Sequence, residues 1–174
     1  MGLLAASLGR SVGLRSSQRG HAGGLQAGGG RGGGPAGILG AGTGLGQAAA
    51  LRIDGRIQVI PSEGGHADFG PRNPVEDRLV VFVREKFGRV DRDRILSGGG
   101  LVLIYEFLKV DGAARERPAV AEAFHREDPA AVISRFALAN EARLCGRSLA
   151  LFVAIYGVAA GDLAVTDRET GCAY

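Results

Sequence analysis

The stretch Val59–Asn73 reads VIPSEGGHADFGPRN and places Glu63, His66 and Asp68 within six positions. The Glu63 carboxylate can accept hydrogen bonds from two neighbouring hydroxyls, and His66 can donate to a third. The double glycine Gly64-Gly65 between them lets a ligand ring approach the backbone, because no Cβ stands in the way. This loop therefore predicts a site for a polyol such as a hexose.

Two other interpretations of the same loop stay open. Glu63, His66 and Asp68 could hold a metal ion, although the loop offers neither a Cys nor a second His, and a hard cation would need more oxygens. Alternatively the loop binds nothing, and backbone groups satisfy its polar side chains. The other histidines, His21 and His125, stand in featureless surroundings and are expected at the surface.

A second glycine-rich stretch, GAGTGLG at Gly40–Gly46, lies upstream of this loop. It does not fit the dinucleotide-binding fingerprint, because the required third glycine is missing, and no Lys follows as in a Walker loop. What remains is a tight turn with free N–H groups and the Thr43 hydroxyl, which can approach an oxyanion closely. A hairpin turn without a ligand is the alternative interpretation.

Short strands are expected to connect the two glycine-rich loops. Ile38-Leu39 ends a strand, and the glycine turn leads the chain back into Gln47–Leu51. Arg52–Ile60 alternates in character around Asp54-Gly55, which is a strong hairpin signal. One small antiparallel sheet should therefore carry both loops.

Helices are predicted after this sheet, and the apolar segment at the end should be buried against it. Hairpins followed by helices indicate a mixed α/β or α+β domain. The expected helices are Val75–Phe87 with Pro74 in its first turn and Gly88 as its stop, Asp91–Leu96 capped by Asp91, Leu101–Val110 after a break at Ser97–Gly100, Pro129–Ala139 capped by Asp128, and Leu144–Val165. Asp111–Pro118 is expected to be a charged loop.

Composition narrows the class of protein. The chain has 174 residues, 45% of them hydrophobic and 22% charged, which suits one soluble domain with its own core. The net charge of +3 comes largely from arginines without interleaved aromatics, so no nucleic-acid partner is expected. The longest apolar run, Leu149–Ala160, is too short for a bilayer, so no membrane partner is expected. Cys145 and Cys172 follow no metal or redox spacing, which favours a reducing compartment such as the cytoplasm.

Residues 1–37 contain no Asp or Glu and consist largely of Gly, Ala, Arg and Ser. Such a composition cannot offset the entropy cost of ordering, so this segment is predicted to be disordered and residues 38–174 to form the domain. An Arg- and Ser-rich, acid-poor segment is also typical of a transit peptide, although the poly-glycine run argues against one. A mis-started translation of GC-rich DNA would give the same mixture, so the origin of the segment stays open.

Taken together, these motifs resemble the bacterial glucokinase family over about residues 37–171. The resemblance implies an actin-like ATPase (ribonuclease H-like) fold of the α/β class. It also implies transfer of the γ-phosphoryl group of ATP to the 6-hydroxyl of glucose, with Mg²⁺ as cofactor. The matching elements, in the family's order, are LGAGTGLG (Leu39–Gly46), VIPSEGGHADFGPRN (Val59–Asn73), EDR (Glu76–Arg78), RILSGGGLVLIYEFL (Arg94–Leu108), DPAAVIS (Asp128–Ser134) and LALFVAIYGVAAGDLAV (Leu149–Val165).

The resemblance also implies roles for individual residues. Glu63 and His66 match the glucose-binding glutamate and histidine of the family. Asp93 stands where the family has a further sugar-binding glutamate, and its side chain is one methylene shorter. The residues that match the phosphate-binding loop for ATP are Gly42, Thr43, Gly44 and Gly46.

Two elements of the family pattern are not found in this sequence. The family's catalytic base is an Asp that follows an Asn, but no acidic residue precedes Asp54 and no Asn-Asp pair occurs. The glycine-rich adenosine segment should follow ETGCAY, where the sequence stops. We therefore expect an incomplete actin-like lobe, with a small antiparallel hairpin and several helices, and assign no catalytic residue and no metal site. Activity, sugar binding without turnover, and an unstable fragment are all open, and a homodimer is expected from the family.

Overall fold

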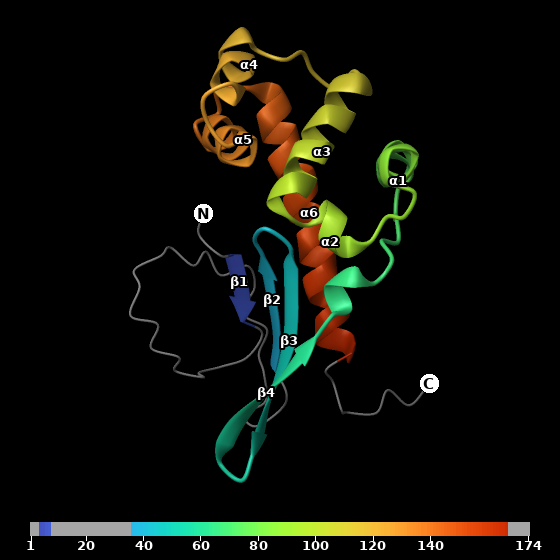
Figure 1. Cartoon of the computed structure of the whole chain (residues 1–174), viewed down its shortest axis with the longest axis vertical. Coiled ribbons are helices and arrows are strands. Elements are labelled where there is room, and N and C mark those ends of the chain that lie inside the picture. Colours follow the sequence, from blue (N-terminus) through green and yellow to red (C-terminus); the bar gives the residue numbers. More distant parts are fainter. Residues whose placement is uncertain (1–3, 8–35, 167–174) are drawn as a thin grey trace.

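The computed structural model describes residues 4–7 and 36–166. An antiparallel sheet of four strands, in the order β1-β2-β3-β4, lies at one end, and most of the helices gather at the other (Figure 1). The strands are β1 (Leu4–Ser7), β2 (Ala36–Ala41), β3 (Leu45–Ile53) and β4 (Arg56–Ser62). A 3-10 turn, η1 (Gly64–His66), precedes the helices α1 (Pro74–Phe87), α2 (Arg92–Ile95), α3 (Gly98–Val110), α4 (Pro118–Phe124), α5 (Pro129–Leu138) and α6 (Arg143–Thr166).

The first strand changes one prediction about the N-terminal segment. Leu4–Ser7 pairs with β2, from Leu4 opposite Ala41 to Ser7 opposite Ile38. The predicted disorder of residues 1–37 is therefore wrong for β1 and for the first two residues of β2. The rest of that segment, residues 1–3 and 8–35, lies outside the described residues.

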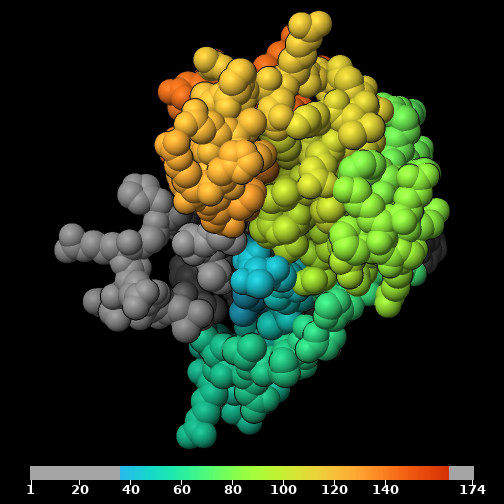
Figure 2. Space-filling model, turned by 45° about the horizontal axis from the view of Figure 1, so that its top comes forward, coloured from blue at the N-terminus to red at the C-terminus, as the bar shows by residue number. Residues whose placement is uncertain are grey.

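Two hairpins build the sheet as predicted. The β2–β3 hairpin turns at residues 42–44, and the β3–β4 hairpin turns at Asp54 and Gly55, with φ of +50° and +77°. Positive φ at both central residues belongs to the turn that matches the twist of paired strands, which is why Asp-Gly is a strong hairpin signal. β4 is exposed along its length, and this hairpin projects away from the helices (Figure 2). Its last residue, Ser62, leads directly into η1.

The first helix follows the sequence prediction closely. The Asn73 side chain accepts hydrogen bonds from the N–H groups of Val75 and Glu76, and Pro74 occupies the first turn. Gly88 ends α1 with a φ of +77°, a conformation that favours glycine. The predicted caps Asp91 and Asp128 are likewise confirmed, on α2 and α5.

The predicted break at Ser97–Gly100 is confirmed at Ser97 but is wrong for the glycines, because α2 ends at Ile95 and α3 already begins at Gly98. The Ser97 hydroxyl accepts a hydrogen bond from Gly100 N at 3.0 Å and caps the helix. A Cβ on Gly100 would come within 2.1 Å of the Ile95 carbonyl oxygen, so this glycine lets α2 and α3 approach each other. The predicted charged loop is also followed by α4, a helix that begins at Pro118 and was not predicted.

The last helix, α6, is buried against the sheet as predicted. Tyr156 donates a hydrogen bond from its hydroxyl to the Leu39 carbonyl of β2 at 2.8 Å, across 117 positions of sequence. Buried side chains of β2, β3 and the helices α1 to α6 form one hydrophobic core. The sheet, α2 and the core helices therefore hold one another in a fixed arrangement.

By length and composition alone, α6 could cross a membrane, since Arg143–Ala164 has a mean hydropathy of 1.6. The sequence prediction considered only the run Leu149–Ala160 and took it as too short for a bilayer. The apolar part of the helix is longer than this run, so the prediction is wrong about the length. One such helix is weak evidence, because core helices of water-soluble proteins pass the same test. Here Phe152, Ile155 and Ala159 of α6 are buried inside the fold.

Candidate functional site

The glycine turn between β2 and β3 is tied to the helical layer. Gly42 N donates to Gly44 O at 2.8 Å, and Gly98 N, at the start of α3, donates to Gly42 O at 2.9 Å. Thr43 is exposed at the tip. Within the described part of the chain, the N–H groups of Thr43 and Gly44 have no hydrogen-bond partner. Two open N–H groups beside a hydroxyl fit an oxyanion such as a phosphate oxygen.

Asp93 of α2 contacts the base of this turn. Its Oδ1 accepts a hydrogen bond from Leu45 N at 2.6 Å. A Cβ on Gly44 would lie 2.5 Å from the same oxygen, so a glycine is needed there for Asp93 to reach the turn. At Gly42 and Gly46 a Cβ would meet nothing closer than 3.9 and 3.7 Å, which is ordinary contact. Packing therefore requires one of these three glycines, and the other two leave open space.

The second glycine-rich loop folds into η1 directly after β4. The Ser62 hydroxyl accepts a hydrogen bond from Gly64 N at 3.0 Å, and His66 N donates to the Glu63 carbonyl at 2.9 Å. A Cβ on Gly65 would lie 2.2 Å from the Leu45 carbonyl oxygen. The double glycine thus has a packing reason that the sequence did not show, because it lets η1 lie against β3.

Four polar side chains meet beside the glycine turn. His66 Nε2 lies 3.7 Å from Glu63 Oε2, and His66 Nδ1 lies 3.6 Å from Asp91 Oδ2. His66, Asp91 and Asp93 each offer a ligand atom, and these atoms all lie within 4.8 Å of one another. The structure therefore brings together the three predicted sugar-binding residues, Glu63, His66 and Asp93, and adds Asp91.

Sequence reasoning assigned Asp91 only as a helix cap, and it does cap α2, since its Oδ1 accepts from Arg94 N at 2.9 Å. Its approach to His66 depends on contacts distant in sequence. Arg92 N donates to the Ala67 carbonyl at 2.9 Å, and an isolated bridge pairs Asp68 with Asp91. One feature of the sequence could have indicated Asp91. It lies two residues before Asp93, at the start of the helix that contacts the loop.

The structure does not support the alternative interpretation, in which Glu63, His66 and Asp68 together hold a metal ion. Arg89 donates to Asp68 Oδ1 at 3.0 Å, and the Asp68 side chain is 80% exposed. Among the described residues, His66 groups instead with Asp91 and Asp93. Exposed acidic groups of this kind commonly occur without an ion, so no metal is assigned to them.

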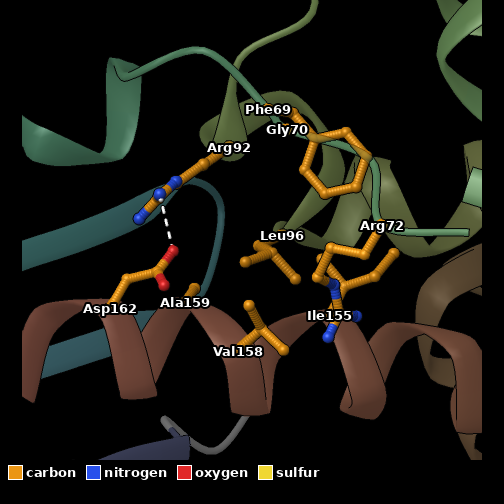
Figure 3. Close-up of a pocket in the computed structure, with 9 residues that line it drawn as sticks. All are labelled: Phe69, Gly70, Arg72, Arg92, Leu96, Ile155, Val158, Ala159 and Asp162. Atoms are coloured by element: carbon orange, nitrogen blue, oxygen red, sulfur yellow. Dashed lines mark hydrogen bonds and ion pairs between the residues drawn. The ribbon is translucent and has the colours of Figure 1, made fainter.

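A separate pocket of ≈190 Å³ lies between the turn after Phe69, α2 and α6 (Figure 3). Its walls are mostly apolar, and an ion pair from Arg92 to Asp162, 2.8 Å long, crosses one side. None of the predicted sugar or phosphate residues lines it. The lining residues are Phe69, Gly70, Arg72, Arg92, Leu96, Ile155, Val158, Ala159 and Asp162.

Comparison with known proteins identifies the family. The sequence matches the family model described as Glucokinase over residues 8–174. The chain belongs to the glucokinase family. The match includes residues 8–36, where the sequence motifs gave no resemblance.

Named relatives agree with this membership. A glucokinase of Nostoc punctiforme is 42% identical over 153 residues, which are 80% of this chain and 45% of that protein. A glucokinase of Yersinia enterocolitica is 38% identical over 141 residues, covering 80% of this chain and 41% of that protein. The chain thus spans less than half the length of the curated relatives it matches.

Solved glucokinase structures share the α/β fold of this chain. A glucokinase from an Antarctic psychrotroph aligns with a TM-score of 0.60 and 29% identity, over 74% of this chain and 37% of that one. The glucokinase of Balamuthia mandrillaris, solved in complex with glucose, aligns with a TM-score of 0.54 and 28% identity, over 64% of this chain and 31% of that one.

Proposed function

We propose that this chain supplies the sugar-binding and phosphate-facing loops of an ATP-dependent glucokinase, within an actin-like ATPase lobe. The observation that carries the proposal is the double contact of Asp93. Its Oδ1 binds Leu45 N at the glycine turn, and its carboxylate belongs to the same group as His66. Asp93 therefore joins the two loops, so a hexose held by the loop of His66 would lie beside phosphates held by the glycine turn.

The sugar side of the site would use hydroxyl recognition. The Glu63 carboxylate is 94% exposed and free to accept hydrogen bonds from sugar hydroxyls. His66 offers a ring nitrogen beside it. Asp93 keeps Oδ2 for a ligand while Oδ1 remains on the turn. Glu63 and His66 are exposed and Asp93 is half-buried, and none of the three lines the apolar pocket near Phe69.

The phosphate side would use the open N–H groups of Thr43 and Gly44 and the Thr43 hydroxyl, with Gly42 and Gly46 leaving room for ATP to approach. When bound, Mg²⁺ would neutralise the phosphate charge during transfer.

A second candidate function is sugar binding without turnover. Phosphoryl transfer to an alcohol is helped by a carboxylate that accepts the hydroxyl proton. The 174 residues contain no Asn-Asp pair, which is the family's source of that base. The residues that would hold glucose are nevertheless present and close together, so binding and chemistry can be tested separately.

Calorimetry with glucose and a coupled assay with glucose and ATP distinguish the candidates. We expect glucose to bind the folded chain and the affinity to fall at least about tenfold in Glu63→Ala, because the variant loses charge-assisted hydrogen bonds. Glu85→Ala removes another exposed glutamate, on α1, and should bind as the wild type does. Turnover that disappears with Glu63 supports the kinase, and binding without turnover supports the second candidate. No heat at millimolar glucose would refute both.

Three further proposals rest on the composition and, for the dimer, on the family. We infer a cytoplasmic location, a homodimer, and no nucleic-acid or membrane partner. Sedimentation of the purified chain tests the dimer, because a monomer at all concentrations would refute it.

A further inference from the structure

His66 lies between two carboxylates, one beside each ring nitrogen. Nδ1 is 3.6 Å from Asp91 Oδ2, and Nε2 is 3.7 Å from Glu63 Oε2. A neutral imidazole carries its proton on one nitrogen, which donates, while the other nitrogen accepts. The carboxylate that faces the N–H group therefore decides what the ring offers to a sugar hydroxyl.

Asp91 is the better fixed of the two carboxylates. Its Oδ1 accepts from Arg94 N at 2.9 Å, and this cap of α2 directs Oδ2 toward the imidazole. The Asp91 side chain is 15% exposed, whereas that of Glu63 is 94% exposed. An exposed charge is screened by water and loses side-chain entropy when it is held, so the Glu63 contact is the weaker one.

Two further charged side chains lie near this ring. Asp93 belongs to the same group, but its Oδ1 is engaged by Leu45 N at 2.6 Å. Arg89 donates to the His66 carbonyl at 2.8 Å and to Asp68, so its guanidinium holds the backbone of the loop. Within the described part of the chain, Asp91 is therefore the carboxylate fixed toward Nδ1.

We propose that Asp91 is a positioning residue of the sugar site, which keeps the His66 proton on Nδ1 and leaves Nε2 bare. Nε2 then accepts a hydrogen bond from a sugar hydroxyl, whereas the sequence alone suggested that His66 donates one. A bare Nε2 beside the Glu63 carboxylate makes a pair of acceptors, which suits a ligand rich in hydroxyl donors. The sugar role rests on the proposed function, but the tautomer can be measured without any sugar.

Asp91→Asn tests the proposal most directly, because Asp91 also caps α2 and this cap fixes the orientation of the new amide. The asparagine Oδ1 must still accept from Arg94 N, so its amide NH₂ would face Nδ1 and donate to it. This moves the imidazole proton to Nε2, as the same exchange does in other carboxylate–histidine pairs. Long-range proton–nitrogen NMR spectra at about pH 8.5, where imidazoles in general are neutral, report which nitrogen carries the proton. A His66→Gln chain identifies the His66 signals among the three histidines.

We expect the proton on Nδ1 in the wild-type chain and on Nε2 in Asp91→Asn. Glucose affinity should fall about tenfold in the same variant. Asp128→Asn is the matched control, because Asp128 caps α5 through Ala131 N at 3.0 Å and is exposed, and it should change neither readout. Asp91→Ser, which keeps a cap without a facing carboxylate, should give mixed tautomers and an intermediate affinity, and it serves if the Asn variant does not fold.

A wild-type chain with the proton on Nε2, or an Asp91→Asn chain with an unchanged tautomer, would overturn the proposal. A switched tautomer with unchanged glucose affinity would overturn it too, because the ring would then be positioned without effect on the sugar. If the wild-type chain binds no glucose, the proposed function and the sugar role of Asp91 both fail. The spectra would still show whether Asp91 sets the tautomer, so the two failures are distinguishable.

Discussion

The Asp93 carboxylate accepts a hydrogen bond from the backbone N–H of Leu45 at 2.6 Å, across 48 positions of sequence. This contact joins a four-residue helix to the turn of a hairpin. A second link, from Gly98 N to the Gly42 carbonyl, reaches the same turn from the next helix. The position of the glycine turn therefore depends on α2 and α3 as well as on its own strands.

Replacing Asp93 should loosen this turn. Asp93→Ala leaves the Leu45 N–H without its acceptor, and we expect a loss of about 1–3 kcal/mol in the free energy of unfolding. Asp93→Asn keeps an oxygen but loses the charge, so a loss of about 1 kcal/mol is expected. Urea denaturation measures both. Equal stability of the Ala variant and the wild type would contradict the importance of this hydrogen bond.

Gly44→Ala should act through Asp93. The added Cβ would lie 2.5 Å from Asp93 Oδ1 and push the carboxylate off Leu45 N, at a cost of about 1–2 kcal/mol. Asp93→Ala removes the oxygen atom with which this Cβ would clash. The double variant should therefore be more stable, by about 1 kcal/mol, than the sum of the two single losses predicts.

Substitutions of the neighbouring glycines are the control for this double-mutant comparison. Gly42→Ala and Gly46→Ala place a Cβ at ordinary contact distances, so they should be neutral or stabilise by up to about 1 kcal/mol through the unfolded state. Strict additivity of Gly44→Ala and Asp93→Ala would show that the two positions act independently.

The double glycine of η1 should respond unequally to the same substitution. Gly65→Ala sets a Cβ 2.2 Å from a backbone oxygen of Leu45, which cannot move without β3, so we expect a loss of about 3 kcal/mol. Gly64→Ala meets only the side-chain amide of Gln47 at 2.6 Å, and a loss of about 1 kcal/mol is expected. Thermal unfolding ranks the variants. Gln47→Ala should restore the stability of Gly64→Ala but not that of Gly65→Ala. The reverse pattern would refute these packing contacts.

Local chemistry explains which elements were predictable. Asp54-Gly55 forms its hairpin because both residues accept positive φ, and Asp128 caps α5 because its carboxylate reaches an N–H three residues on. Such signals lie within a few residues of the structure they specify. The sequence therefore sufficed for both hairpins and for the start of α5.

Contacts distant in sequence explain the failures. The glycines at 98–100 have poor helix propensity, yet they form the first turn of α3, where the Ser97 hydroxyl caps the helix and only a glycine at position 100 fits against Ile95. The start of α4 has no side-chain cap at Arg117, so only Pro118 marked it. Asp91 reaches His66 through a bridge between segments 23 residues apart, Asp68 and Asp91, which no local pattern specifies.

Glu76 is the buried carboxylate that holds the turn before α1, and its side chain is 1% exposed. It accepts hydrogen bonds from the backbone N–H and guanidinium of Arg72 and from the Asn73 amide, at 2.7–3.3 Å. Glu76→Gln replaces one acceptor by a donor that would face these donors, so we expect a loss of about 2–4 kcal/mol. Glu106→Gln, at an exposed pair with Lys86, should cost less than about 1 kcal/mol. Similar losses for the two variants in urea denaturation would argue against a structural role of the buried carboxylate.

Cys145 should make the stability of the chain sensitive to alkaline pH. Burial raises the pKa of this thiol from 9.0 to about 11. A pKa that is higher in the folded state gives stability that is complete below the unfolded value and is lost as the pH rises toward the folded value. Between pH 7 and about pH 10.5 we therefore expect wild type to lose about 2 kcal/mol more than Cys145→Ala, whose residue does not titrate. Cys172 is present in both chains, so its titration cancels in the difference. A stability difference that stays constant with pH, measured by urea denaturation, would disprove this linkage.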